Sequence, residues 1–349
     1  MQSEQPPVID FSHQIRQACE RFGFFQLINH DVPVELQHQV IDKCKELFKL
    51  PLEIKEKYAK EVDFLICRNP PDIGGYNRGY ECLRSQNFEK QGKGDFKEGY
   101  YMGKDLSLDD QYVIDKRFGQ GPNKYPAELR DPKEFQRVMD EYHEVMTKLA
   151  KNLLQVLACT LNLPTNYFDD FCDHPVAALR LLHYPPQDPA TTEVEKGKLL
   201  YPRPYGIGAH TDFGAVTMLL QDETGGLQVW DNHSSEWVDV TPIAGAYVVN
   251  LGNMMMRWTN DRYLSNLHRV INKGGHERFS VPFFFSGNPN YTVECLPSCA
   301  DPQMGAKYPP VMVHDWMSGR FADTYGSSEG KAFGDLRQEV VAGMDGNRI

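Results

Sequence analysis

The chain lacks three features that would each define a class of protein. None of its apolar runs approaches the roughly 18 residues of a membrane span. Basic residues are not in excess, since 37 Lys and Arg against 48 Asp and Glu give a formal net charge of −11. No internal repeat is visible. We therefore expect no membrane span, no repeat array and no nucleic-acid partner, because phosphate binding needs a basic face.

Zinc-binding and redox motifs are also missing. The eight cysteines are scattered along the 349 residues, and none forms a Cys-X2-Cys pair. The first nine residues are polar and show no charged-then-apolar secretory pattern. We therefore expect reduced thiols and a cytoplasmic protein.

The first 131 residues combine short helices with a long loop-rich stretch. Apolar periodicity predicts helices over residues 12–22 and 34–48, with a short strand at 24–28 between them. Residues 64–131 are rich in glycine, proline and tyrosine, which is typical of lids and binding loops. We interpret residues 1–131 as an N-terminal region with lid-like loops.

The remainder predicts one long helix and then a β-rich core. From residue 131 to residue 157, apolar side chains recur at steps of three and four, as in an amphipathic helix. After Pro175 the period falls to two, which predicts an antiparallel barrel or jelly roll of about eight strands. We assign residues 132–325 to this helix and core, and 326–349 to a polar tail. The β-rich stretches are residues 178–184, 215–220, 227–230, 237–240, 247–251, 267–271 and 278–285.

Two histidines and a carboxylate stand out within the β-rich part. His210 and Asp212 are two residues apart, so on a strand their side chains would point the same way. His268 lies in another strand-like stretch. Two imidazoles and one carboxylate form the triad that holds non-haem Fe(II) and leaves other coordination positions open. The sequence therefore predicts an iron site.

A possible carboxylate clamp follows His268. Arg278 and Ser280 would share one face of a strand. A guanidinium binds a carboxylate through two parallel hydrogen bonds, and a hydroxyl can add a third. An Arg that points into a barrel is costly unless it meets an anion. The sequence thus pairs a metal site with an anion site.

This ordered set resembles the 2-oxoglutarate- and Fe(II)-dependent dioxygenases. Within them it is most similar to the branch of flavonoid and gibberellin oxygenases and isopenicillin N synthase. The resemblance runs in unbroken order from about residue 7 to residue 325, and it also includes Phe22-Gly23-Phe24-Phe25, Ile28-Asn29-His30, Leu182-His183-Tyr184-Pro185 and Trp258-Thr259-Asn260.

The resemblance implies a fold and a set of roles. The fold would be mainly β with packed helices: a double-stranded β-helix, or jelly roll, with a helical N-terminal region. The cofactor would be Fe(II), with 2-oxoglutarate as co-substrate and O₂ as oxidant. The implied iron ligands are His210, Asp212 and His268, and the implied 2-oxoglutarate contacts are Arg278, Ser280 and Tyr184.

Two positions depart from the family pattern. Leu182 replaces the usual Asn two residues before Tyr184, and Asn253 stands where many relatives have Asp. Neither is a ligand position, so the prediction of an iron site stands.

Substrate-facing residues are predicted from their positions. Continued alternation past Ser280 turns Phe284 inward, and Phe213 adjoins the triad. Tyr76 lies in the loop-rich stretch and could cover a substrate or anchor a loop. The same alternatives apply to Tyr80, Tyr100 and Tyr101.

Arg180 has two possible environments. It alternates with Leu179 and Leu181, so it could enter the barrel. Exposure to solvent or an ion pair is the favoured interpretation.

We expect an enzyme that oxidises a small organic molecule by hydroxylation, desaturation or ring modification. We expect this enzyme to act in specialised metabolite biosynthesis and to be a monomer. One alternative is an iron oxidase that resembles isopenicillin N synthase and does not use 2-oxoglutarate. Another is an ethylene-forming enzyme. A third is a non-enzymatic barrel that binds a small ligand. Succinate formation that depends on 2-oxoglutarate would separate the first class from the oxidase.

Overall fold

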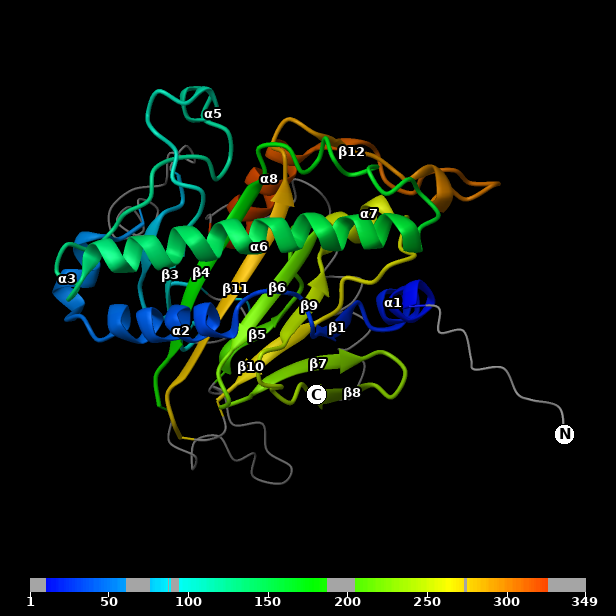
Figure 1. The fold of residues 1–349 in the computed structure, drawn as a ribbon. Helices are drawn as coiled ribbons and strands as arrows, with labels where there is room; N and C mark the ends of the chain where they lie inside the picture. The colour runs from blue at the N-terminus through cyan, green and yellow to red at the C-terminus, as the bar shows by residue number, and fades with distance from the viewer. Residues whose placement is uncertain are drawn as a thin grey trace, which may run out of the picture.

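Two antiparallel sheets face each other and form the core of the molecule (Figure 1). The computed structural model describes residues 11–60, 76–86, 88, 94–186, 205–272 and 275–325. The seven strands of the larger sheet are, in spatial order, β1 (Phe24–Leu27), β9 (Tyr247–Leu251), β6 (Val216–Gln221), β11 (Arg278–Gly287), β4 (Val176–Tyr184), β3 (Glu98–Met102) and β2 (Gly79–Glu81). The four of the smaller sheet are β5 (Tyr205–His210), β10 (His268–Ile271), β7 (Leu227–Asp231) and β8 (Glu236–Asp239). The predicted jelly-roll architecture is confirmed.

Helices cover the outer face of the larger sheet. The long helix α6 (Pro132–Thr160) crosses this sheet, with α2 (Val34–Phe48) beside it (Figure 1). Asp131 caps α6, because its side chain accepts a hydrogen bond from the Glu134 N–H. The other helices are α1 (Phe11–Arg21), α3 (Leu52–Lys57), α5 (Gln111–Ile114), α7 (Asn253–Trp258), α8 (Val313–Tyr325) and the 3-10 turn η2 (Pro297–Cys299). A separate two-stranded sheet pairs β12 (Thr292–Val293) with β13 (Val311–Met312).

The register of the larger sheet decides which side chains face inward. Ser280 on β11 lies opposite Leu182 on β4 and Gln221 on β6. Four residues along β11, Phe284 lies opposite Thr217 on β6. Residues directly opposite each other share a face, so these side chains all point toward the smaller sheet. The alternate residues of β11, among them Phe279, Val281 and Phe283, join the core beneath the helices.

The interior between the sheets is apolar at its centre. One cluster of buried side chains joins Leu182 and Val248 of the larger sheet to Ile207, Val229 and Val270 of the smaller one. Packing within this cluster fixes the distance between the two sheets. A site built from both sheets depends on that distance.

Several short elements were not predicted. Among them, β2 and β3 arise in the stretch interpreted as loop, β5 precedes His210, and α7 follows β9. Since β3 pairs with β4, the first 131 residues contribute strands to the same sheet as the later region. The division at residue 131 stays a prediction. The polar tail at 326–349 and part of the lid-like stretch lie outside the described residues.

No helix within the described ranges is both long enough and apolar enough to cross a membrane.

Candidate metal centre

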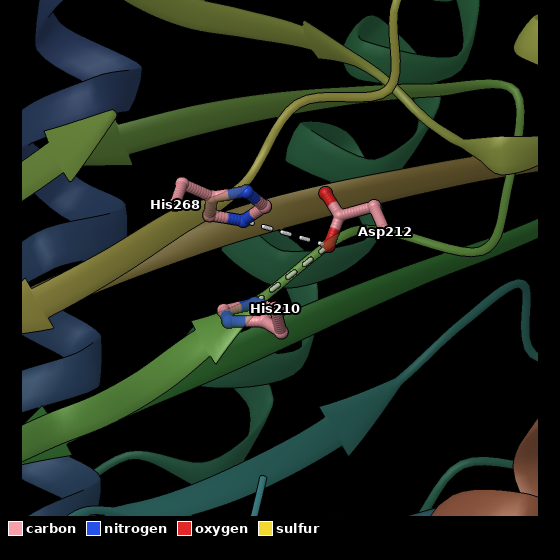
Figure 2. A group of neighbouring side chains, drawn as sticks. All are labelled: His210, Asp212 and His268. Atoms are coloured by element: carbon pink, nitrogen blue, oxygen red, sulfur yellow. Dashed lines mark ion pairs between the residues drawn. The ribbon is translucent and has the colours of Figure 1, made fainter. Parts of the chain in front are cut away.

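His210, Asp212 and His268 lie together at one end of the smaller sheet (Figure 2). His210 is the last residue of β5, and His268 is the first of β10, directly opposite it in the register. The Asp212 Oδ1 atom lies 3.9 Å from His210 Nε2 and 3.7 Å from His268 Nε2. All three residues are buried.

One detail of the sequence prediction was wrong. Asp212 was expected to share a strand with His210, but β5 ends at His210 and Asp212 lies in the loop that follows. The two side chains converge because Asp212 is held by other strands, and strand alternation plays no part.

Backbone carbonyls fix both imidazole rings. His210 Nδ1 lies 2.8 Å from the Gly208 carbonyl oxygen, and His268 Nδ1 lies 3.2 Å from that of Asn266. A carbonyl can only accept, so each Nδ1 is the donor, and in the neutral ring each Nε2 then presents a lone pair. In each ring it is Nε2 that lies within 4 Å of Asp212 Oδ1. The rings are therefore prepared to bind a metal through Nε2.

The Asp212 carboxylate is oriented in the same way. Its Oδ2 atom accepts hydrogen bonds from Thr217 Oγ1 at 2.6 Å and from Asn250 Nδ2 at 2.7 Å. Thr217 and Asn250 lie opposite each other on β6 and β9. The larger sheet thus holds one carboxylate oxygen and leaves Oδ1 toward the histidines. Such an arrangement suits a divalent transition metal with open coordination positions.

Arg278 is buried inside the barrel, where it is 1% exposed. Its guanidinium donates to the Gly225 carbonyl at 2.7 Å, to Ser280 Oγ at 3.1 Å and to Gln221 Oε1 at 3.1 Å. Among the described residues, no carboxylate lies within ion-pair distance of it. A buried guanidinium bonded to neutral groups alone is suited to receive an anion.

Tyr184 lies against this guanidinium. The Arg278 Cζ atom is 4.8 Å from the centre of the Tyr184 ring. Burial raises the pKa of the Tyr184 phenol, and the nearby Arg278 charge opposes part of that rise. The phenol therefore stays protonated near neutral pH and can donate a hydrogen bond.

The three residues predicted to face substrate have different surroundings. Phe284 is half-buried on the inner face, opposite Thr217. Phe213 follows Asp212, and Arg320 lies 5.5 Å from the centre of its ring. The Tyr76 ring packs so closely on Gly121 that a Cβ there would lie 2.2 Å from it. Contact with substrate stays a prediction for all three.

Tyr80 and Tyr100 act as anchors. Their rings are buried in the core beneath the helices. The Tyr80 hydroxyl donates to Glu98 at 2.6 Å, and the Tyr100 hydroxyl donates to the Lys124 carbonyl at 3.0 Å.

The sequence analysis missed a buried ionic cluster on the inner face. Arg180 is 5% exposed and is paired with Glu81, so it forms the ion pair that was favoured, but inside the barrel, which was the less favoured environment. Lys60 and Lys97 each lie 3.2 Å from the same carboxylate. Alternation with Leu182 and Tyr184 could have placed Arg180 inside, but Glu81 fell in a stretch interpreted as loop.

Two family models match the chain. Residues 175–287 match the model described as the 2OG-Fe(II) oxygenase superfamily. Residues 3–128 match the model described as the non-haem dioxygenase in morphine synthesis N-terminal region. The first of these matches includes all three residues of the candidate metal centre.

Curated proteins and solved structures agree with these matches. The chain is 45% identical to the 2-oxoglutarate-Fe(II) type oxidoreductase hxnY of Emericella nidulans, over 93% of this chain and 91% of that protein. It is 43% identical to the 2-oxoglutarate-dependent dioxygenase citB of Monascus ruber, over 81% and 80%. A crystal structure of a 2OG-Fe(II) oxygenase family protein from Caulobacter crescentus superposes with a TM-score of 0.73 at 27% identity, over 90% of this chain and 93% of that one.

Proposed function

Because the chain belongs to the 2OG-Fe(II) oxygenase superfamily, we propose that His210, Asp212 and His268 hold its iron. The protein is an Fe(II)- and 2-oxoglutarate-dependent oxygenase that oxidises a small organic molecule. The observation that carries the ligand assignment is the convergence of two Nε2 atoms and Asp212 Oδ1, with each side chain fixed by a hydrogen bond on its far side.

Arg278, Ser280 and Tyr184 are proposed to bind 2-oxoglutarate. Two buried groups support this. The Arg278 guanidinium has no acidic partner among the described residues, and Gln221 Nε2 has no hydrogen-bond acceptor there. Gln221 accepts from Arg278 through its carbonyl, and the amide nitrogen at the same end of its side chain is left without an acceptor. A carboxylate bound beside both side chains would accept from the guanidinium and from this amide.

The metal-binding residues and the residues that bind 2-oxoglutarate have different roles in catalysis. Iron and 2-oxoglutarate, when bound, supply the activation of O₂ that oxidises the substrate. The chain orients three side chains that would hold the metal, and a three-ligand site would leave positions for the co-substrate and O₂. Arg278 and Ser280 would hold the far carboxylate of the co-substrate and so position it in the barrel.

The substrate is proposed to be a moderately apolar molecule of specialised metabolism. Phe284, Phe213 and Tyr76 are the side chains proposed to face it. The relatives include a protein named clavatol oxidase from Penicillium crustosum, which supports oxidation of a small organic molecule. We further propose a cytoplasmic monomer without a nucleic-acid partner, in keeping with the net charge of −11.

Anaerobic metal binding and co-substrate turnover test this function. The wild-type protein should bind one Fe(II) and form succinate only when 2-oxoglutarate is present. His210→Ala should lose both properties. His233→Ala removes an exposed histidine from the β7–β8 turn and should keep both. If His210→Ala still bound Fe(II) as tightly as wild type, the ligand assignment would be wrong. Turnover without 2-oxoglutarate would favour the isopenicillin N synthase-like alternative.

A further inference from the structure

Strand β5, which ends at His210, lies at an edge of the smaller sheet. Its pairing partner on one side is β10. Backbone groups on the open side of an edge strand need partners from elsewhere. The Gly208 N–H finds one in Asp95, whose Oδ1 accepts it at 2.9 Å. Asp95 comes from the connection between β2 and β3, outside the strands that carry the metal site.

Gly208 is also the residue that orients His210. Its carbonyl oxygen lies 2.8 Å from His210 Nδ1. Glycine has the greatest backbone freedom of any residue, so a glycine used as an anchor needs to be held itself. Asp95 therefore holds the N–H of the same residue whose carbonyl fixes the imidazole.

Asp95 is itself firmly placed. It is 4% exposed, and its own N–H donates to the Gln86 carbonyl at 2.7 Å. The Gln86 side chain accepts from Arg180 at 3.0 Å, and Arg180 pairs with Glu81. The buried ionic cluster thus supports the backbone that presents Asp95 to β5.

A second contact reaches His210 from the same connection. The Phe88 ring stacks on the His210 imidazole with the ring centres 4.4 Å apart and an angle of 9° between planes. The β2–β3 connection therefore contacts the ring directly through Phe88 and indirectly through Asp95 and Gly208.

We propose that Asp95 is a positioning residue for the metal ligand His210. Its Oδ1 atom fixes Gly208, so that the Gly208 carbonyl holds Nδ1–H and Nε2 faces the metal. This inference rests on the proposed role of His210 as a ligand. It requires a hydrogen-bond acceptor at the place of Oδ1 and does not require a negative charge. Within the described residues Oδ2 has no hydrogen-bond partner, so an amide nitrogen in its place breaks no bond there.

Three substitutions of Asp95 separate geometry from charge. Asp95→Asn keeps the acceptor in place and removes the charge. Asp95→Glu keeps the charge and displaces the acceptor by one methylene. Asp95→Ala removes both. The matched control is Asp140→Ala on α6, which deletes a carboxylate that accepts from the Tyr125 hydroxyl.

Cobalt(II) binding to the anaerobic full-length chain gives the test. Asp95→Ala and Asp95→Glu should bind Co(II) about tenfold or more weakly, as expected when a group behind a metal ligand is lost. Their Co(II) d–d absorption spectra should differ from wild type, a change that loss of fold stability alone would not produce in the bound protein. Asp95→Asn and Asp140→Ala should match wild type in both measurements.

Two results would overturn the proposal. One is wild-type Co(II) affinity and spectrum in Asp95→Glu, which remains informative if Asp95→Ala does not fold. The other is an Asp95→Asn variant as weak as Asp95→Glu, because charge would then be the property that counts. A separate experiment tests the ligand assignment. If His210 were not a metal ligand, His210→Ala would bind Co(II) as tightly as wild type.

Discussion

Every ligand atom of the candidate metal centre is oriented by a partner on its far side. For the two imidazoles the partner is a carbonyl close in sequence, on Gly208 or Asn266. For Asp212 the partners are side chains from two strands of the opposite sheet, Thr217 and Asn250. Asp212 is therefore the ligand whose side chain is held directly by side chains of the opposite sheet.

Thr217→Val tests this dependence at nearly constant volume. The change removes the hydroxyl that donates to Asp212 Oδ2 at 2.6 Å, so Asp212 should lose part of its orientation. We expect Fe(II) affinity to fall by about tenfold, measured by anaerobic titration. Thr224→Val, which removes a hydroxyl near the Glu277 carbonyl, is the control and should leave the affinity unchanged. Equal affinities for both variants would contradict the account.

Arg278→Ala tests the clamp. A charge-assisted hydrogen bond contributes about 1.5–3 kcal/mol, so the concentration of 2-oxoglutarate needed for half-maximal succinate formation should rise roughly 10- to 100-fold. Arg137→Ala removes an exposed Arg from α6 and should have no effect. An unchanged 2-oxoglutarate requirement in Arg278→Ala would refute the assignment.

The elements differ in how well the sequence predicts them. α6 is long, and its apolar periodicity reports one buried face directly. The paired strands β4 and β11 are also long, and strand alternation divides their side chains between two largely buried faces. The inward direction of Arg278 and Ser280 follows from that alternation, and the structure places both inside. β2 has three residues and β5 carries two glycines, so neither has a strong local preference. These strands form because neighbouring strands pair with them, and such distant contacts leave no local pattern.

Helix α6 also carries a histidine that should make stability depend on pH. His143 is buried, with Nε2 2.9 Å from the Ala177 carbonyl on β4, and burial lowers its pKa to about 4 from 6.5. Between these two pH values, His143 binds a proton in the unfolded chain but stays neutral in the folded chain. The free energy of unfolding should therefore fall as the pH is lowered from about 6.5 to about 4.

Urea unfolding at several pH values measures this effect. His143→Gln keeps an amide donor for Ala177 and cannot titrate, so its unfolding free energy should depend less on pH in this window. His38→Gln, at an exposed position on α2, should keep the wild-type dependence. The same slope in His143→Gln and wild type would show that His143 does not cause it.

Over the whole molecule, the site depends on both sheets. The smaller sheet supplies the two histidines, and the larger sheet supplies the clamp and the two groups that hold Asp212. An unfolded chain cannot assemble these groups, so metal and co-substrate bind the folded state alone. Ligand binding should therefore stabilise the whole fold.

Thermal unfolding measures that linkage. At 100 times its dissociation constant a ligand adds about 2.7 kcal/mol to the free energy of unfolding, so Mn(II) with 2-oxoglutarate should raise the Tm by several degrees. Asp212→Ala should lose this rise while keeping the Tm increase that a general osmolyte gives. An equal ligand-induced rise in Asp212→Ala and wild type would place the binding elsewhere.

The most direct test of the central claim is a crystal structure of the protein with Mn(II) and 2-oxoglutarate, prepared without O₂. We predict one metal ion bonded to His210 Nε2, Asp212 Oδ1 and His268 Nε2, with the far carboxylate of 2-oxoglutarate on Arg278 and Ser280. A metal ion bound at other residues, or a co-substrate carboxylate away from Arg278, would contradict the account.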